Sequence, residues 1–284
     1  MRPRPACASA RLTATAGFRN TTERMLQKSF RRPQFFYTTA PLPCPYLEDR
    51  LERKLVTELS GADAEALHDR LSRAGFRRSH NIAYAPVCPG CQACIPIRIN
   101  GRAFRPSRTQ RRVAAANAAV EGFEVPPRAT TEQFALFQRY QAARHADGDM
   151  AAMGFYDFRA MVEDTPIETC MVEFRDPDDT LVAACLTDRL SDGLSAVYSF
   201  FDPRHSARSL GTFMILWLVR RALALDLPHV YLGYWVPESR KMAYKAAFRP
   251  AEILWGGQWR SLTSAEVARG PEPVPPHAEP VSTG

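Results

Sequence analysis

Three cysteines stand close together in one short segment, CPGCQAC, at Cys88, Cys91 and Cys94. Two successive C-x-x-C spacings in a tight turn can bring thiolates together around zinc or an iron–sulfur cluster. A fourth ligand would complete the site, and Cys44 is the natural candidate. Small buried thiols are the alternative, since free cysteine is among the most buried residue types. The spacing therefore predicts a structural metal or cluster site.

Arginine gathers in the segment after this cluster. About a dozen residues without an acid contain Arg102, Arg105, Arg108, Arg111 and Arg112. Basic density of one sign can track the phosphate oxygens of a nucleic acid, whereas solvated faces usually mix charges. A solvated basic face is the simpler alternative.

A second basic group comes late in the chain, on or beside a predicted helix. It comprises Arg240, Lys241, Lys245 and Arg249. Lys241 and Lys245, four residues apart, would share the exposed face of that helix, opposite Ala246. Like charges at this spacing repel each other, and a bound polyanion would relieve the repulsion. The pattern favours a second contact with nucleic acid.

Between these groups, a strand, a loop and a helix are predicted in succession. Residues 198–201 read as a strand and residues 229–232 as another, with a helix between them that Ser209 caps. Such a helix start directs backbone N–H groups at the oxygens of an acyl or phosphate group. The candidate acyl or oxyanion loop is Arg208, Ser209, Leu210 and Gly211. This loop partly matches that of acetyl-CoA acyltransferases, but Phe213 stands where Gly or Ala is expected.

The rest of the chain predicts alternating helices and short strands. Leu47, Leu51, Leu55 and Leu59 recur at helical spacing, and a second helix is predicted from Asp63 to Gly75. Thr130 and Gln133 have capping-box spacing for a later helix. Further helices are predicted at 108–120 and 157–162, and strands at 76–85, 95–100, 170–174, 181–187 and 195–201. The predicted fold class is α/β (α+β), a mixed sheet flanked by helices.

Composition narrows the class of protein. The chain has 284 residues and a formal net charge of +7, which allows a polyanionic partner. No apolar run approaches the length of a membrane span. Seven cysteines, an odd number without a secretory signal, favour reduced thiols in the cytoplasm. Cys170 and Cys185 are predicted to be core residues.

Several separated motifs carry a resemblance to a known family. The segments FFDP, ARSLG, YLGYW and SRKMAYKAAFRP resemble the C-terminal domain of the aminoacyl-tRNA-protein transferases, with the greatest likeness to the bacterial leucyl branch. The segment RPSRTQRR is similar to a motif shared by the family. The likeness runs from about Gln34 to Leu262. It implies an acyltransferase fold of the GNAT type. It also implies an enzyme that transfers leucine from aminoacyl-tRNA to an N-terminal Asp or Glu and so marks proteins for degradation.

The resemblance also suggests divisions of the chain. Residues 1–33 would be a disordered leader or an upstream extension, since the likeness begins after Met25, which could be the initiator. Residues 34–128 would form an N-terminal region with the cysteine cluster, and residues 129–269 the acyltransferase-like domain. The Pro-rich residues 270–284 are predicted to be disordered. Nothing in the sequence sets the oligomeric state.

Specific residues are candidates for the roles that the resemblance implies. For tRNA binding they are Arg105, Arg108, Arg111, Arg112, Lys241 and Lys245. For the acidic acceptor peptide they are Arg78, His80 and Arg98, because an arginine fork can hold a carboxylate. Asp202, Tyr234 and Tyr244 are candidate catalytic residues that position the substrates.

The chemistry itself requires no cofactor, because an aminoacyl-tRNA ester is already activated. Three alternatives stay open: an arginyl instead of a leucyl donor, an acyl-CoA N-acyltransferase of the same fold, and a non-catalytic, metal-dependent RNA-binding module.

Overall fold

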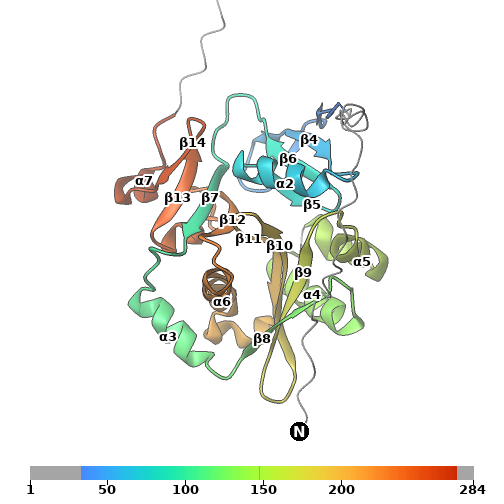
Figure 1. The fold of residues 1–284 in the computed structure, drawn as a ribbon, viewed down its shortest axis with the longest axis vertical. Coiled ribbons are helices and arrows are strands. Elements are labelled where there is room, and N and C mark those ends of the chain that lie inside the picture. The colour runs from blue at the N-terminus through green and yellow to red at the C-terminus, as the bar shows by residue number, and fades with distance from the viewer. Residues whose placement is uncertain (1–32, 147, 274–284) are drawn as a thin grey trace, which may run out of the picture. The chain divides into compact units, whose positions relative to one another are not determined.

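The strand, helix and strand predicted around Ser209 form one crossover unit in the computed structural model, which describes residues 33–146 and 148–273 (Figure 1). The unit consists of β11 (Gly193–Phe201), α6 (Leu210–Ala224) and β12 (His229–Trp235). Strands β11 and β12 pair in parallel, which requires a crossover connection of this kind. This prediction is confirmed. Nearly all of the predicted leader, with Cys7, and most of the predicted tail lie outside the described residues.

The crossover unit sits inside an eight-stranded sheet of order β14-β13-β7-β12-β11-β10-β9-β8. All neighbouring pairs in this large sheet except β11 and β12 are antiparallel. The sheet is therefore mixed, as predicted. Its other strands are β7 (Ile95–Asn100), β8 (Glu121–Val125), β9 (Thr169–Arg175), β10 (Leu181–Leu190), β13 (Ala251–Trp255) and β14 (Gln258–Ser261). The predictions at 95–100, 170–174, 181–187 and 195–201 are confirmed, while β8, β13 and β14 were not predicted.

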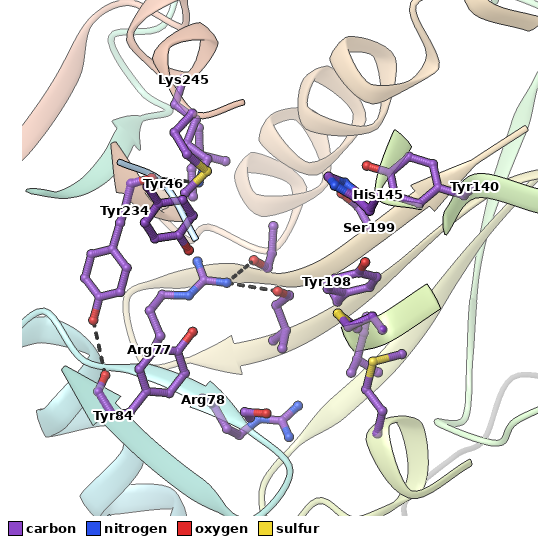
Figure 2. Close-up of a pocket in the computed structure, with 18 of the residues that line it drawn as sticks. Tyr46, Arg77, Arg78, Tyr84, Tyr140, His145, Tyr198, Ser199, Tyr234 and Lys245 are labelled. Atoms are coloured by element: carbon purple, nitrogen blue, oxygen red, sulfur yellow. Dashed lines mark hydrogen bonds between the residues drawn. The ribbon is translucent and has the colours of Figure 1, made fainter. Parts of the chain in front are cut away.

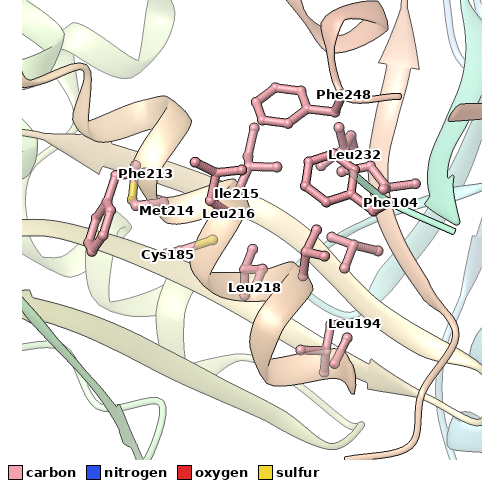
Figure 3. Close-up of a cluster of buried hydrophobic side chains, with 14 of the residues drawn as sticks. Phe104, Cys185, Leu194, Phe213, Met214, Ile215, Leu216, Leu218, Leu232 and Phe248 are labelled. Carbon is pink, nitrogen blue, oxygen red and sulfur yellow. The ribbon is translucent and has the colours of Figure 1, made fainter. Parts of the chain in front are cut away.

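Helices cover both faces of the large sheet. Helix α6 packs with α3 (Arg108–Ala116) on one face, and α4 (Thr131–Arg144) packs with α5 (Phe155–Glu163) on the other (Figure 1). Successive strand residues alternate between these layers. Val172 belongs to the α6 core and Met171 to the α4 core. Figure 3 shows the first of these cores around α6.

A second, four-stranded sheet of order β1-β4-β6-β5 corrects one prediction. The segment with regularly spaced leucines is not a helix but forms strands. The small sheet consists of β1 (Tyr37–Thr38), β4 (Lys54–Glu58), β5 (Arg77–Ser79) and β6 (Ile82–Pro86), and a separate ribbon pairs β2 (Leu42–Pro43) with β3 (Leu51–Glu52). A spacing of four is even, so it also matches the period of two in a strand, and pairing with β6 decides the outcome.

The predicted capping signals had different outcomes, because neither Asp63 nor Ser209 makes a side-chain cap. Thr130 and Gln133 form the predicted capping box at the start of α4, and Ser107 forms another at α3. Helix α2 (Ala64–Arg73) also lies where the second helix was predicted. The remaining short elements are η1 (Asp149–Ala152), η2 (Pro203–Arg208), η3 (Ala243–Ala247) and α7 (Ser264–Arg269). None of the helices in the described residues has the length and hydrophobicity needed to cross a membrane.

The large sheet runs across the domain boundary that was predicted at residue 128. Strand β7 precedes that boundary, yet it lies between β12 and β13, which follow it. Residues from Phe35 onward belong to one compact unit. The N-terminal region therefore contributes a central strand to the C-terminal sheet.

A buried ion pair joins the small sheet to the large one. Arg78 of β5 donates from Nε and Nη2 to the two carboxylate oxygens of Asp188 on β10, each at 2.7 Å. Thr169 donates a further hydrogen bond to the same carboxylate at 2.9 Å. Asp188 is completely buried and Arg78 is 4% exposed. The two parallel hydrogen bonds from the guanidinium to the carboxylate satisfy both buried charges and fix the position of β5 relative to β10.

We expect Arg78→Met to lower the free energy of unfolding by about 3–5 kcal/mol, because it leaves the Asp188 carboxylate buried without its cation. The double variant Arg78→Met/Asp188→Leu should recover much of that loss, since it removes both buried charges. Urea unfolding of the three proteins measures this. A single variant as stable as the unmodified protein would show that the pair does not hold the sheets together.

Candidate active site

The two sheets meet around an inner cavity of about 480 Å³. Strand β5 supplies Arg77, β11 supplies Tyr198 and β12 supplies Tyr234 (Figure 2). The wall also carries aromatic and thioether side chains from other segments, namely Tyr46, Tyr84, Tyr140, Tyr244, Met150, Met153, Met161 and Met242. A cavity of this size and lining can hold a medium-sized apolar side chain beside polar groups.

The ionisable side chains on this wall include basic residues: Arg77, Arg78, His80, His145 and Lys245. Among the described residues, no carboxylate lines the inner cavity. Asp188, which neutralises Arg78, lies behind the wall. The electrostatics of the cavity therefore favour an anionic group in the ligand.

Arg77 reaches across the cavity to the large sheet. Its Nη2 donates to the backbone carbonyls of Ala196 at 3.0 Å and Val197 at 2.9 Å (Figure 2). Its Nη1 is buried and has no hydrogen-bond partner among the described residues. Gly233, with a positive φ of 76°, makes room for the guanidinium, because a Cβ there would lie 1.8 Å from Nη1. Only glycine fits this position comfortably.

Lys245 corrects the prediction for the second basic group. It is 8% exposed, and its Nζ donates to the backbone carbonyl of Tyr234 at 2.7 Å. Burial, and repulsion from Arg77, hold the pKa of Lys245 well below its usual value. Lys241 is exposed, so the two lysines do not share a face. The segment forms only the short η3. The prediction of a helix that exposes both lysines on one face was therefore wrong.

An outer cavity of about 560 Å³ adjoins the inner one. The two share Tyr140, His145, Ser199 and Tyr244. The outer cavity also contains Arg144, Arg240 and Lys241, together with Ser209, Gly211 and Thr212 at the start of α6. Burial and the cations of Lys241 and Arg144 lower the pKa of His145. Exposed cations beside a helix N-terminus suit phosphate groups.

The three candidate catalytic residues have different places. Tyr234 lines the inner cavity, and its hydroxyl donates to the carbonyls of Gly75 at 3.1 Å and Tyr84 at 3.2 Å. Tyr244 lines both cavities and is 48% exposed. Asp202 lines neither cavity: it is buried and accepts hydrogen bonds from the Arg204 side chain and backbone, which lower its pKa to about 2. Its predicted contact with substrate is corrected to a structural role at η2.

The three residues predicted to bind the acceptor peptide also differ in whether a ligand in the cavities could reach them. His80 lines the inner cavity, whereas Arg78 is occupied by Asp188. Arg98 lies outside both cavities, where its Nε donates to Glu252 at 2.8 Å and its guanidinium lies over the Trp259 ring. Arg98 is therefore corrected to a structural residue of the sheet.

The predicted acyl or oxyanion loop is only partly available to a ligand. Ser209 and Gly211 line the outer cavity, but Leu210 is buried in the core and the Arg208 guanidinium pairs with Asp176 at 2.7 and 2.8 Å. Ser209 has a positive φ of 52° and makes no side-chain cap, contrary to the prediction. Phe213 is also core, at 2% exposure.

Comparison with known families shows which family this chain belongs to. Residues 42–112 match the family model described as arginine-tRNA-protein transferase, N terminus, and residues 132–255 match the C-terminus model of the same family. The chain belongs to the aminoacyl-tRNA-protein transferase family. The two matches fall on either side of residue 128, although the sheet of this family member crosses that point.

Relatives within the family are similar over nearly their whole length. An aspartate/glutamate leucyltransferase of Granulibacter bethesdensis is 64% identical over 257 residues, covering 90% of this chain and 96% of the relative. A protein of the same name from Gluconacetobacter diazotrophicus is 64% identical over 88% of this chain and 98% of its own. Among solved structures, the C-terminal domain of a putative lysylphosphatidylglycerol synthetase from Agrobacterium fabrum covers 63% of this chain and 62% of its own at 12% identity, with a TM-score of 0.44.

The arginines of the segment similar to the family motif are exposed around the start of α3. They are Arg105, Arg108, Arg111 and Arg112. None of them lines the two cavities. The start of α3 contacts the end of η3 through Gln110, whose Nε2 donates to the Ala247 carbonyl at 3.1 Å. This hydrogen bond joins the two segments that carry the predicted basic groups. The arginines themselves form a surface that is separate from the walls of the two cavities.

The four cysteines proposed as ligands line one further cavity, together with Tyr46 and Arg50. Arg50 donates to the Cys91 sulfur at 3.4 Å, and the Arg53 backbone donates to the Cys88 sulfur at 3.3 Å. Burial, followed by the electrostatic effect of Cys44, raises the pKa of the Cys94 thiol to about 12. In the described part of the chain, no three His, Cys, Asp or Glu side chains are arranged to hold a metal ion.

Sequence reasoning missed Arg77 and chose its neighbour Arg78 instead. The two arginines are adjacent in strand β5, and nothing local distinguishes them. Their difference arises from Asp188, which lies 110 residues further along the chain and occupies only Arg78. Tyr46, which also lines the cavity, was missed because its place there is set by the tertiary fold (Figure 2).

Proposed function

We propose that this chain is an enzyme that transfers leucine from leucyl-tRNA to the N-terminal Asp or Glu of acceptor proteins. The observation that carries the proposal is the pair of adjoining cavities, one apolar and cationic and the other open and basic, in a member of this family. The relatives that carry the leucyltransferase name support it. The product would be a peptide bond that marks the acceptor for degradation.

The two cavities suit the two ends of an aminoacyl-tRNA. In our proposal, the terminal phosphates of the tRNA lie against Arg144, Arg240 and Lys241 in the outer cavity. The ester then extends past the shared residues Ser199 and Tyr244 into the inner cavity. An exposed, one-signed wall is where phosphate contacts are expected, because they release counterions.

Leucine is favoured over arginine as the donor by the chemistry of the inner wall. Methionines and Leu186 offer apolar contact to a branched aliphatic side chain. An arginyl side chain would need a carboxylate partner, and the described residues of this wall provide none. A leucyl group would meet no such cost.

The reaction requires alignment more than a strong base. An α-amine has a pKa of roughly 8 and is partly neutral near pH 7. Its nitrogen attacks the ester carbonyl, a C–N bond forms, the C–O bond to the ribose breaks, and the ribose oxygen takes up a proton. Holding the two groups together can lower the barrier by about 7–11 kcal/mol in ideal cases. Water or the Lys245 amine, whose pKa is lowered, can accept the proton that the attacking nitrogen loses.

The proposal includes a GNAT-like acyltransferase fold and activity in the cytoplasm, where charged tRNA is used. An acyl-CoA N-acyltransferase is less well supported, because Phe213 fills the core where a pyrophosphate loop needs a small residue. A non-catalytic RNA-binding module would leave the inner cavity without a role.

The first test mixes the purified protein with leucyl-tRNA and a peptide that begins with Asp. We expect the peptide mass to rise by one leucine residue, and a Glu peptide to react likewise. Arginyl-tRNA and acetyl-CoA, supplied separately, should give little or no product. Transfer from arginyl-tRNA alone would replace the donor, and acetylation of the peptide would replace the reaction class.

The two lysines of the η3 region provide a matched test of tRNA contact. Lys241→Ala should reduce the slope of log binding constant against log salt by about 0.7–0.9, the value of one phosphate contact. Lys245→Met should leave the slope unchanged, because its amine is buried against Tyr234. Filter binding of leucyl-tRNA at several salt concentrations measures both. An equal loss in the two variants would contradict this assignment of the cavities.

We also propose a structural zinc or iron–sulfur cluster at Cys44, Cys88, Cys91 and Cys94. Four sulfur donors suit either group by their chemistry, although the described residues do not place three of them in the arrangement that holds a metal ion, and N–H donors from Arg50 and Arg53 contact two of the sulfurs. The group would tie the turn before β7 to the segment around Cys44. It has no step in the transfer.

Protein isolated without oxygen should contain about one zinc ion or one iron cluster per chain by elemental analysis. The Cys94→Ser variant should lose it and should unfold at a lower urea concentration. Cys185→Ser, a cysteine of the core, provides the control and should keep the metal. Metal-free wild-type protein with full stability would exclude the site.

A further inference from the structure

Arg77 lines the inner cavity with a guanidinium that the described residues do not fully satisfy. Its Nη2 is occupied by the Ala196 and Val197 carbonyls, while the buried Nη1 has no partner in the part of the chain that the structure describes. A buried donor without an acceptor is costly, and native proteins seldom retain one unless a ligand or water satisfies it. The fold nevertheless keeps this guanidinium in place with two backbone carbonyls and the gap at Gly233.

The other strongly basic groups of this wall are already engaged. Arg78 forms its fork with Asp188, and Lys245 donates to the Tyr234 carbonyl. Arg77 shares the cavity wall with these basic groups, and among the described residues it has no carboxylate partner. An arginine keeps its charge at every physiological pH. The cavity therefore retains one uncompensated positive charge.

Tyr46 adds a second donor beside Arg77. Both side chains line the inner cavity (Figure 2). Burial raises the pKa of Tyr46, so its hydroxyl remains protonated and able to donate. A guanidinium and a phenol that line one cavity can together bind a small carboxylate.

We propose that Arg77, assisted by Tyr46, binds the side-chain carboxylate of the first residue of the acceptor protein. This inference rests on the proposed function and names the part of the site that selects the acceptor. Arg77 is thus a specificity-determining residue: an amide side chain such as Asn would bring its own N–H group against these donors and leave them without an anion. The α-amine of the same residue then remains free to attack the leucyl ester.

The test compares two peptides that differ only in their first residue, Asp or Asn, with leucyl-tRNA as donor. We expect Arg77→Met to lower kcat/KM for the Asp peptide by roughly 10- to 100-fold, the effect of losing one charged hydrogen bond. Its value should approach that of the Asn peptide, which changes little. Arg77→Lys should restore part of the preference, because it keeps the charge but not the fork.

Two further variants separate selectivity from general damage. Lys241→Met, in the outer cavity, should lower transfer to both peptides by the same factor and leave their ratio unchanged. Tyr46→Phe, which removes a single oxygen, should lower the Asp-to-Asn ratio several-fold and supports the proposal even where Arg77→Met does not fold. Loss of activity toward both peptides alike in Arg77→Lys and Tyr46→Phe would overturn it. Absence of transfer by the unmodified protein would overturn the proposed function instead.

Discussion

The buried pair between Arg78 and Asp188 is the constraint on which the arrangement of the site depends. It connects strand β5 of the small sheet with β10 of the large sheet through two hydrogen bonds of 2.7 Å. A buried charge that loses its partner is strongly unfavourable, so β5 cannot shift along the large sheet at low cost. Arg77 is adjacent to this anchor in the chain. Its position over the carbonyls of β11 is therefore set by an interaction in which it takes no part.

The second organising feature is a sheet assembled from distant parts of the chain. Strand β7 lies next to β12, the strand that follows the α6 crossover, and both carry buried residues of one core. The N-terminal segment thus supports the strand that carries Gly233 and Tyr234. Two regions that match separate family models consequently build a single cavity wall, and neither could form it alone.

Local sequence signals predicted the elements, and long-range partners decided the site. The capping box of Thr130, the strand at 95–100 and the strand–helix–strand unit each depend on neighbouring residues, and all were predicted correctly. Lys245 looked like a solvated lysine because its burial comes from the tertiary fold. The choice between two adjacent arginines was equally inaccessible, since it depends on an aspartate 110 residues away.

The concentration of cations in the inner cavity has a further physical consequence. Burial, and repulsion from Arg77, which keeps its proton, lower the pKa of Lys245. A carboxylate bound at Arg77 would cancel much of this repulsion and raise the pKa of Lys245 toward its usual value. The lysine would then favour its charged form once the acceptor is bound. In this arrangement, one electrostatic contact both recognises the acceptor and sets the charge of the neighbouring lysine.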